Sequence, residues 1–232
     1  MKTGKILLAT AILIGLWASA RPVQAADSAT APPKGMMELK LDLPRPVFSG
    51  TPKNAPPGTN IEPPRKGPRP PLFVPEGTVN VARGKKVTSS DMEPIIGELS
   101  LITDGDKATV DGSFVELGPG LQWVQIDLEK PCEIYAVALW HFHQDPRVFR
   151  GVVVQTADDP DFIENVKTHF NNDSTNETGL GIGQDKQYYE TFEGKLIPVK
   201  DTTARYVRLY SKGNTADAQN QYIEVEVFGK PK

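Results

Sequence analysis

Residues 123–140, WVQIDLEKPCEIYAVALW, contain the pattern that decides the fold class. Polar or aromatic residues alternate with aliphatic ones in the first six positions, which places the aliphatic side chains on one face of a strand. From Glu133 the run is apolar at both alternating sets of positions, as is typical of a central strand covered on both faces. The stretch therefore predicts a half-buried strand at 123–128 and a fully buried one at 133–142.

Six further runs, rich in β-branched and aromatic residues, are separated by Gly, Asp, Asn and Pro, which indicates more short strands. They cover 82–89, 114–117, 151–157, 190–199, 204–211 and 222–228. No amphipathic helical pattern of useful length separates them, so the pattern favours an antiparallel β-sandwich over alternating parallel strands and helices. The long polar stretch at 158–189 predicts a surface loop.

The composition changes sharply near Gly77. Residues 77–232 have the length and texture of one β-rich domain. Residues 26–76 hold 13 of the chain's 21 prolines, which predicts a linker or an extended segment. Within it, MELKLDL at 37–43 alternates apolar and charged residues, so we expect a strand that adds to the edge of a sheet.

The first 25 residues resemble a secretory signal peptide. Two lysines precede a short apolar run at 6–17, and V-Q-A precedes Ala26, the expected first residue of the mature chain. A membrane anchor is the alternative, but a spanning helix needs about 20 apolar residues and this run is shorter. We therefore expect a secreted protein, extracellular or periplasmic, with no transmembrane segment in the mature chain.

The charge balance argues against a nucleic-acid partner, and the cysteine content excludes an internal disulfide. Removing residues 1–25 takes away three basic residues and no acid, which leaves 23 basic against 29 acidic residues and a net charge of −6. Such a balance argues against a nucleic-acid partner. The single cysteine, Cys132, cannot form an internal disulfide, and its place at the start of an apolar strand predicts a buried, inert thiol.

Five segments occur in the order and approximate spacing seen in the discoidin family, also called the coagulation factor type C domain, of the galactose-binding-like superfamily. They are NVARGKKVTSS, LITDGDKAT, WVQIDLEKPCEIYAVALW, ARYVRLYS and YIEVEVFG, within a match that spans 79–229. The resemblance implies an eight-stranded antiparallel jelly-roll β-sandwich, generally not catalytic, that binds ligands through loops at one end.

The acidic loop DGDKATVDG at 104–112 is either a turn or a metal site. Asp and Gly are common in turns, yet closely spaced oxygen donors also suit Ca²⁺. An EF-hand is excluded, because Thr109 stands where that motif requires glycine. The discoidin resemblance implies a structural calcium ion, with a plain Asx-turn as the alternative. Its implied ligands are the side chains of Asp104 and Thr109, the carbonyls of Leu101 and Asp106, and Glu224 from the last strand.

A second cluster of candidate residues follows the central strand, in LWHFHQDPRVFR at 139–150. Sugar sites combine an apolar surface with paired polar groups, and this stretch offers both. The predicted ligand-binding residues are Phe142, His143, Asp145, Arg147 and Phe149, and Arg147 matches the family's loop arginine most nearly. The resemblance has a gap: Thr109 is followed by VDGSF, in which only Phe114 replaces the expected aromatic residue. The ligand is therefore a glycan or, equally, a peptide or protein surface, and a solvated Arg147–Asp145 pair is the alternative.

A zinc enzyme is the weaker reading of the same stretch. His141 and His143 would share one face of a strand, and His169 would complete a three-histidine site able to activate water. Nothing in the sequence brings His169 near the pair. The sequence therefore predicts a secreted, non-catalytic module that binds carbohydrate, with a structural or cell-adhesion protein that binds a protein partner as the alternative. Asn172 and Asn176 lie in glycosylation motifs that matter only for a eukaryotic source.

Overall fold

The computed structural model describes residues 31–47, 60–63, 65 and 67–232, of which 32–232 form one compact unit. The predicted signal peptide lies outside the described residues. No helix in the described part of the chain is long and apolar enough to cross a membrane.

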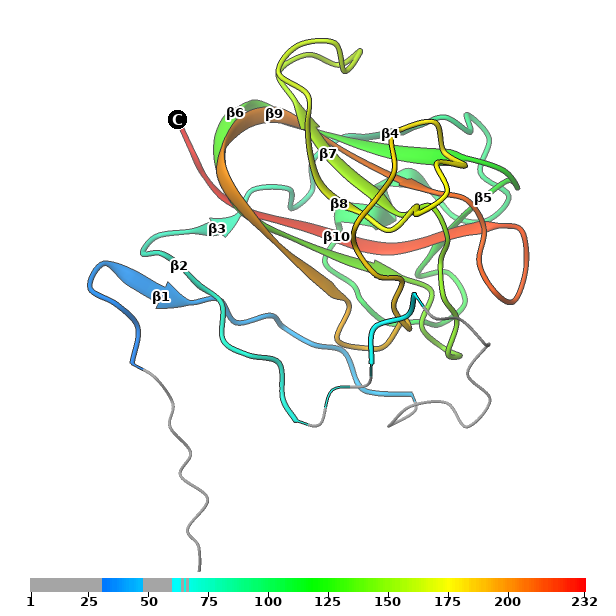
Figure 1. The fold of residues 1–232 in the computed structure, drawn as a ribbon, viewed down its shortest axis with the longest axis horizontal. Helices are drawn as coiled ribbons and strands as arrows, with labels where there is room; N and C mark the ends of the chain where they lie inside the picture. Colours follow the sequence, from blue (N-terminus) through cyan, green and yellow to red (C-terminus); the bar gives the residue numbers. More distant parts are fainter. Residues whose placement is uncertain (1–30, 48–59, 64, 66) are drawn as a thin grey trace, which may run out of the picture. The chain divides into compact units, whose positions relative to one another are not determined.

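An antiparallel sheet of eight strands builds the domain, in the order β3-β10-β6-β9-β7-β8 with β4 beside β6 and β5 beside β10 (Figure 1). The strands are β3 (Val79–Asn80), β4 (Val87–Ser89), β5 (Val115–Leu117), β6 (Gln122–His141), β7 (Val153–Ala157), β8 (Lys167–Asn171), β9 (Lys195–Ser211) and β10 (Asn220–Pro231). The one helix described is a short 3-10 helix, η1 (Leu99–Thr103). The predicted all-β antiparallel sandwich is thus confirmed.

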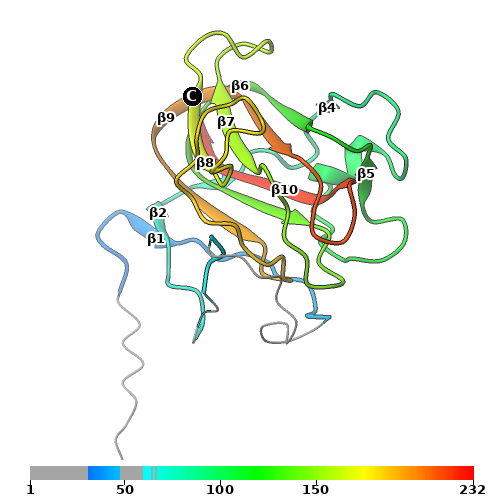
Figure 2. The same cartoon turned by 45° about the vertical axis from the view of Figure 1, so that its right-hand side comes forward.

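Two long strands, β6 and β9, run through both layers of the sandwich (Figures 1 and 2). Each joins two segments that the sequence suggested were separate strands. Their pairing shifts register after Asp127, and Glu129 and Asp201 have positive φ angles of 69° and 46°. Such irregularities bend a strand sharply, so the first part of β6 pairs with β4 while the second part pairs with β10.

Two main-sheet strands, β3 and β8, were not predicted. The short strand β3 lies before the predicted strand at 82–89, and β8 lies within the polar stretch assigned to a loop. Its sequence KTHFN buries only Phe170 and Asn171, so its composition does not distinguish it from a loop. It forms the sheet edge by pairing with β7.

The core between the layers contains the aliphatic faces of β6, β7, β9 and β10, including Val124, Ile126, Leu139, Val154, Val207, Leu209, Val225 and Val227. Cys132 lies in this core as a free thiol, as predicted. Burial raises the pKa of the Cys132 thiol, which disfavours the reactive thiolate.

The proline-rich segment differs most from its prediction. Its described residues from Pro32 on, 32–47, 60–63, 65 and 67–76, form what we call the extension. Strands β1 (Met36–Glu38) and β2 (Phe73–Pro75) pair only with each other, so the expected strand at 37–43 is shorter and joins no edge of the main sheet. Leu39 and Val74 are buried against the outer face of the main sheet. They pack in a second cluster with Phe114, Ala136, Ala138, Trp140, Ile223 and Phe228.

Polar contacts fasten a second part of the extension to the loop that precedes β9. The amide of Glu62 donates to the Gln187 carbonyl at 2.7 Å, and Arg69 donates to the carbonyls of Glu193 and Gly194 at 2.8 and 2.7 Å. Lys195 forms an ion pair with Glu62. The extension is therefore packed and hydrogen-bonded onto the sandwich at both of its described parts.

Candidate functional site

The acidic loop after η1 is both a turn and a contact with the last strand. Asp104 Oδ1 accepts the amide of Asp106 at 2.7 Å, and Asp106 Oδ1 accepts that of Ala108 at 2.8 Å. These are Asx-turns. Gly105, at φ 81°, donates its amide to Glu224 Oε2 at 3.0 Å. The loop and β10, 119 residues apart in the chain, therefore meet as the proposed ligand set requires.

Two oxygen atoms in this contact are buried without a hydrogen-bond partner among the described residues: Glu224 Oε1 and Thr109 Oγ1. Burial raises the pKa of Glu224 to about 8, against the opposing effects of the Gly105 amide and the Lys107 ammonium group. Lys107 is itself buried and paired with Glu226 at 2.8 Å. Unpaired buried oxygens are costly, and each is of a type that an oxygen-binding cation accepts as a ligand.

The donor set is compatible with calcium only if the backbone contributes. The described part of the chain contains no group of three or more His, Cys, Asp or Glu side chains that could hold a metal. Calcium accepts carbonyl and hydroxyl oxygens as well as carboxylates. The predicted carbonyl donors, Leu101 and Asp106, lie just before and within this same loop.

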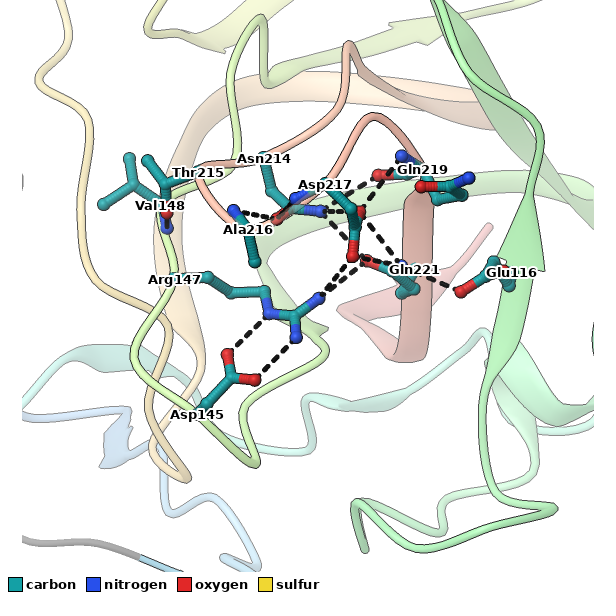
Figure 3. A network of polar contacts seen from close by, with 10 residues as sticks. All are labelled: Glu116, Asp145, Arg147, Val148, Asn214, Thr215, Ala216, Asp217, Gln219 and Gln221. Atoms are coloured by element: carbon teal, nitrogen blue, oxygen red, sulfur yellow. Dashed lines mark hydrogen bonds and ion pairs between the residues drawn. The ribbon is translucent and has the colours of Figure 1, made fainter.

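The loop between β6 and β7 is organised around Arg147. Its guanidinium group donates to both oxygens of Asp145 at 2.6 Å, to Asp217 Oδ2 at 3.2 Å and to Gln221 Oε1 at 3.3 Å. Figure 3 shows the side chain between Asp145 on its own loop and Asp217 on the loop before β10. These bonds raise the pKa of Arg147, although burial, the largest single influence, acts to lower it.

Arg147, predicted either to contact a ligand or to form a solvated pair with Asp145, does pair with Asp145 but is only 8% exposed. Four of the five guanidinium donors are directed at other side chains of the protein. Arg147 joins two loops, and the carboxylates that it holds face the solvent. Asp145 and Asp217 retain 52% and 35% of their side-chain exposure.

The two predicted aromatic residues are buried or half-buried and pack against other side chains. Phe149 is buried and stacks on His141 with ring centroids 4.2 Å apart. Phe142 is half-buried, edge-on to Phe114 at 5.1 Å and 4.6 Å beneath Arg147. These rings pack within the protein, so they do not provide the platform that the sequence suggested.

The three histidines have three different partners. His141 Nδ1 meets Glu190 Oε1 at 2.7 Å, His143 Nε2 meets the Lys107 carbonyl at 3.0 Å, and His169 Nε2 meets Thr156 Oγ1 at 2.9 Å. Burial lowers the pKa of His143, and it lowers that of His169 to about 4. The structure therefore does not assemble the three-histidine site on which the zinc hypothesis depends.

Three features of this region were not predicted from the sequence. Asp217 and Gln221 belong to the Arg147 network, and the polar run NTADAQNQ before the last strand was the available signal. A cleft between the extension and the acidic loop had no signal in the sequence. Asn172 is buried and bonded to the amide of Val152, so it is not accessible for glycosylation in the folded chain, whereas Asn176 is exposed.

Comparisons with known proteins give structural neighbours only. No family model matches the chain, and no curated protein matches it. A family 89 glycoside hydrolase from Clostridium perfringens, in complex with GlcNAc-alpha-1,4-galactose, is 18% identical with a TM-score of 0.50, covering 66% of this chain and 15% of that one. A fucose-binding module from Streptococcus pneumoniae is 18% identical with a TM-score of 0.46, covering 67% and 98%.

A third neighbour is the CBM32 module of AlyQ in complex with 4,5-unsaturated mannuronic acid, 19% identical with a TM-score of 0.46, covering 62% of this chain and 93% of that one. Identities this low speak to the fold alone. The chain therefore has an antiparallel β-sandwich fold, while membership of the galactose-binding-like superfamily, and of the discoidin family within it, stays a prediction.

Proposed function

We propose that this chain is a non-catalytic carbohydrate-binding module whose ligand contacts the loops before β7 and β10. One observation carries the proposal: two solvent-facing carboxylates, Asp145 and Asp217, are held by a single buried guanidinium group. Several structural neighbours are described as carbohydrate-binding modules, which agrees with the proposal without carrying it.

The geometry suits hydroxyl groups. Both carboxylates are hydrogen-bonded to Arg147, so they present their remaining lone pairs as acceptors, and charged acceptors form the stronger bonds to hydroxyl donors. Asp217 is fixed further by the side-chain amide of Asn214 at 2.6 Å and the amide of Gln219 at 3.0 Å. Because the acceptors are ordered before binding, a sugar pays little entropy to use them.

A structural calcium ion in the acidic loop is part of the proposal. Asp104, Thr109 and Glu224 would hold it with the carbonyls of Leu101 and Asp106, and it would supply only charge neutralisation for the buried oxygens. Such an ion would fasten the loop before β5 to the last strand. We also propose export by the predicted signal peptide, which sequencing of the exported protein's N-terminus would test.

A protein partner is the second candidate, favoured by one observation. The loop before η1 exposes 90% of Met92 and 56% of Ile95, and large exposed apolar side chains that cluster often mark interaction surfaces. Substituting both with serine would reduce adhesion to a protein surface and leave glycan binding unchanged.

A glycan array with purified protein tests the carbohydrate proposal. Asp145→Ala and Asp217→Ala should each weaken binding of the best ligand about tenfold or more, since a hydrogen bond to a charged group contributes about 1.5–3 kcal/mol. Asp161→Ala removes an exposed carboxylate from the loop after β7 and should bind as wild type. Wild-type affinity in both site variants would refute the proposed site.

A further inference from the structure

A cleft of about 490 Å³ lies between the extension and the acidic loop. Residues 42–45 and Val47 form one wall, residues 105–110 form the other, and Gln144 also lines it. The volume falls within the range of about 300–1,000 Å³ that is typical of small-molecule sites.

Three polar side chains at this cleft have no partner among the described residues, unlike those of the Arg147 network and unlike Asp106 and Lys107, which also line the cleft. Within the described residues, Asp42, Arg45 and Gln144 make no side-chain hydrogen bond and no ion pair. They are all exposed at the cleft. Arg147, by contrast, directs four bonds at neighbouring side chains. The cleft therefore holds donors and acceptors that remain available to a ligand.

Apolar side chains lie among these polar groups. Leu43, Val47 and Val110 line the cleft and are 42%, 54% and 59% exposed. Such a mixture matches a sugar chain, because each ring presents a C–H face that leaves water favourably and a rim of hydroxyl groups that need partners.

The cleft adjoins the carboxylate pair. Gln144 lines the cleft and is followed directly by Asp145, while the bond of His143 to the Lys107 carbonyl joins the two loops at 3.0 Å. The cleft and the carboxylate pair are thus linked through consecutive residues of one loop, Gln144 and Asp145.

The part of the extension that forms this wall is anchored on the sandwich just before the cleft. Leu39, three residues before Asp42, is buried, and its amide donates to the Leu72 carbonyl at 2.8 Å. This anchoring means that a ligand would not have to order the chain there, which lowers the entropic cost of binding.

We propose that the extension forms one wall of an extended glycan site. One sugar unit is bound at Asp145 and Asp217, and the following units lie in the cleft between Arg45 and Val110. The proposal rests on the carbohydrate-binding function and adds to it that the ligand is an oligosaccharide whose length is recognised.

Calorimetric titration of full-length protein with a hexasaccharide, the tightest found on the glycan array, and with its component monosaccharide tests this. Wild type should bind the hexasaccharide at least tenfold more tightly. Arg45→Ala should weaken hexasaccharide binding about tenfold, as expected for a charge-assisted hydrogen bond, and leave monosaccharide binding unchanged. Gln144→Ala should act in the same direction with a smaller effect.

Lys40→Ala is the matched control, because it removes one positive charge from the same segment at a position outside the cleft. It should bind both ligands as wild type. The inference is overturned if the hexasaccharide has no advantage, if Arg45→Ala and Gln144→Ala both retain it, or if Lys40→Ala loses as much as Arg45→Ala. In each case Asp145→Ala still reports on the carbohydrate function separately, and if wild type binds no saccharide both proposals fail.

Discussion

The loop at 142–150 and the extension each differ from what their sequences suggest, in opposite directions. The loop contains the charged and aromatic residues expected of a binding surface, yet His143, Arg147 and Phe149 are buried and engaged with other residues of the protein. The extension has the composition of a linker, yet Leu39 and Val74 are buried, and Asp42 and Arg45 line a cleft.

The difference teaches that residue type does not reveal whether a polar group is already satisfied. An arginine beside two well-placed carboxylates joins loops, whereas an arginine flanked by prolines in an extended chain stays available. The predictions below ask how much each region contributes to stability, and whether its unsatisfied groups await a ligand.

The largest effect is expected when the extension is removed. A chain that begins at Gly77 uncovers the outer face of β6 and β10, including Trp140 and Ile223. Burial of one large apolar side chain contributes about 1.5–3 kcal/mol, and Leu39 and Val74 are only the two most buried of those lost. We expect this truncation to lower the free energy of unfolding by several such increments, or to give aggregated protein, in a urea titration.

A chain that begins at Pro32 is the control and should unfold as the full-length protein does, because residues 32–232 form one compact unit. Equal stability of the two truncations would show that the extension is a linker after all. That outcome would remove the main contrast between the two regions.

The limits of sequence reasoning follow from the same contrast. The strands of the core were visible because alternation at 123–128 and continuous apolarity at 133–140 follow directly from burial on one or both faces. The joining of these segments into β6 was not visible, since it depends on a bend at Glu129. Packing of Leu39 on a sheet formed by residues 100 positions later is set by tertiary contact alone.

Part of the candidate site, like part of the fold, was predictable from the sequence. The family resemblance implied that Glu224 meets the acidic loop, and the structure brings Glu224 Oε2 within 3.0 Å of the Gly105 amide, while calcium binding there stays a prediction. The hydrogen bonding of Arg147 within the protein was not predictable, because Asp217 and Gln221 come from the loop before β10 and from β10 itself, 70 and 74 residues away. Sequence patterns predict which strand or loop a residue belongs to. They do not predict which hydrogen-bond partners the fold brings to that residue.

The next largest effect on stability is expected from the titration of the Glu224 carboxyl group as pH changes. Its pKa is raised from an unfolded value of about 4.3 to about 8 in the folded chain. The folded state then binds the proton more tightly, so its stabilising contribution is present below pH 4 and is lost as pH rises through about 8. With chelator present, the stability of wild type should fall over this interval, and Glu224→Gln should remove that component of the decline.

Added Ca²⁺ should reverse the decline in wild type alone. At 100 times its dissociation constant the ion would contribute about 2.7 kcal/mol, and its affinity should weaken as pH falls below about 8 because the proton competes for Glu224. Thermal melts with calcium and with chelator between pH 5 and pH 9 measure both effects. A calcium response that is the same at every pH would exclude Glu224 as a ligand.

Arg147→Met tests whether the loop's charge is structural. The substitution keeps much of the side-chain volume but removes four hydrogen bonds, two to Asp145 on the same loop and two that reach Asp217 and Gln221. Breaking a fully buried pair costs about 3–5 kcal/mol, and the partial exposure of both carboxylates reduces the expected loss to about 2 kcal/mol. Chemical denaturation measures it. A surface pair would cost less than about 1 kcal/mol, so a loss that small would restore Arg147 as a candidate ligand contact.

The smallest effect, and the sharpest in sign, is expected at Thr109. Its hydroxyl group is buried without a hydrogen-bond partner among the described residues, so Thr109→Val replaces a costly buried group with an apolar one of the same shape. With chelator present, the variant should be as stable as wild type or more stable, by up to about 1 kcal/mol, because leaving such a group unpaired costs about 1–3 kcal/mol. With saturating Ca²⁺ the order should reverse, since wild type gains a ligand that valine lacks. Melting curves of the two proteins under both conditions test this. If Thr109→Val remains at least as stable as wild type in calcium, the Thr109 hydroxyl group does not bind the ion, and the acidic loop is a turn without a metal site.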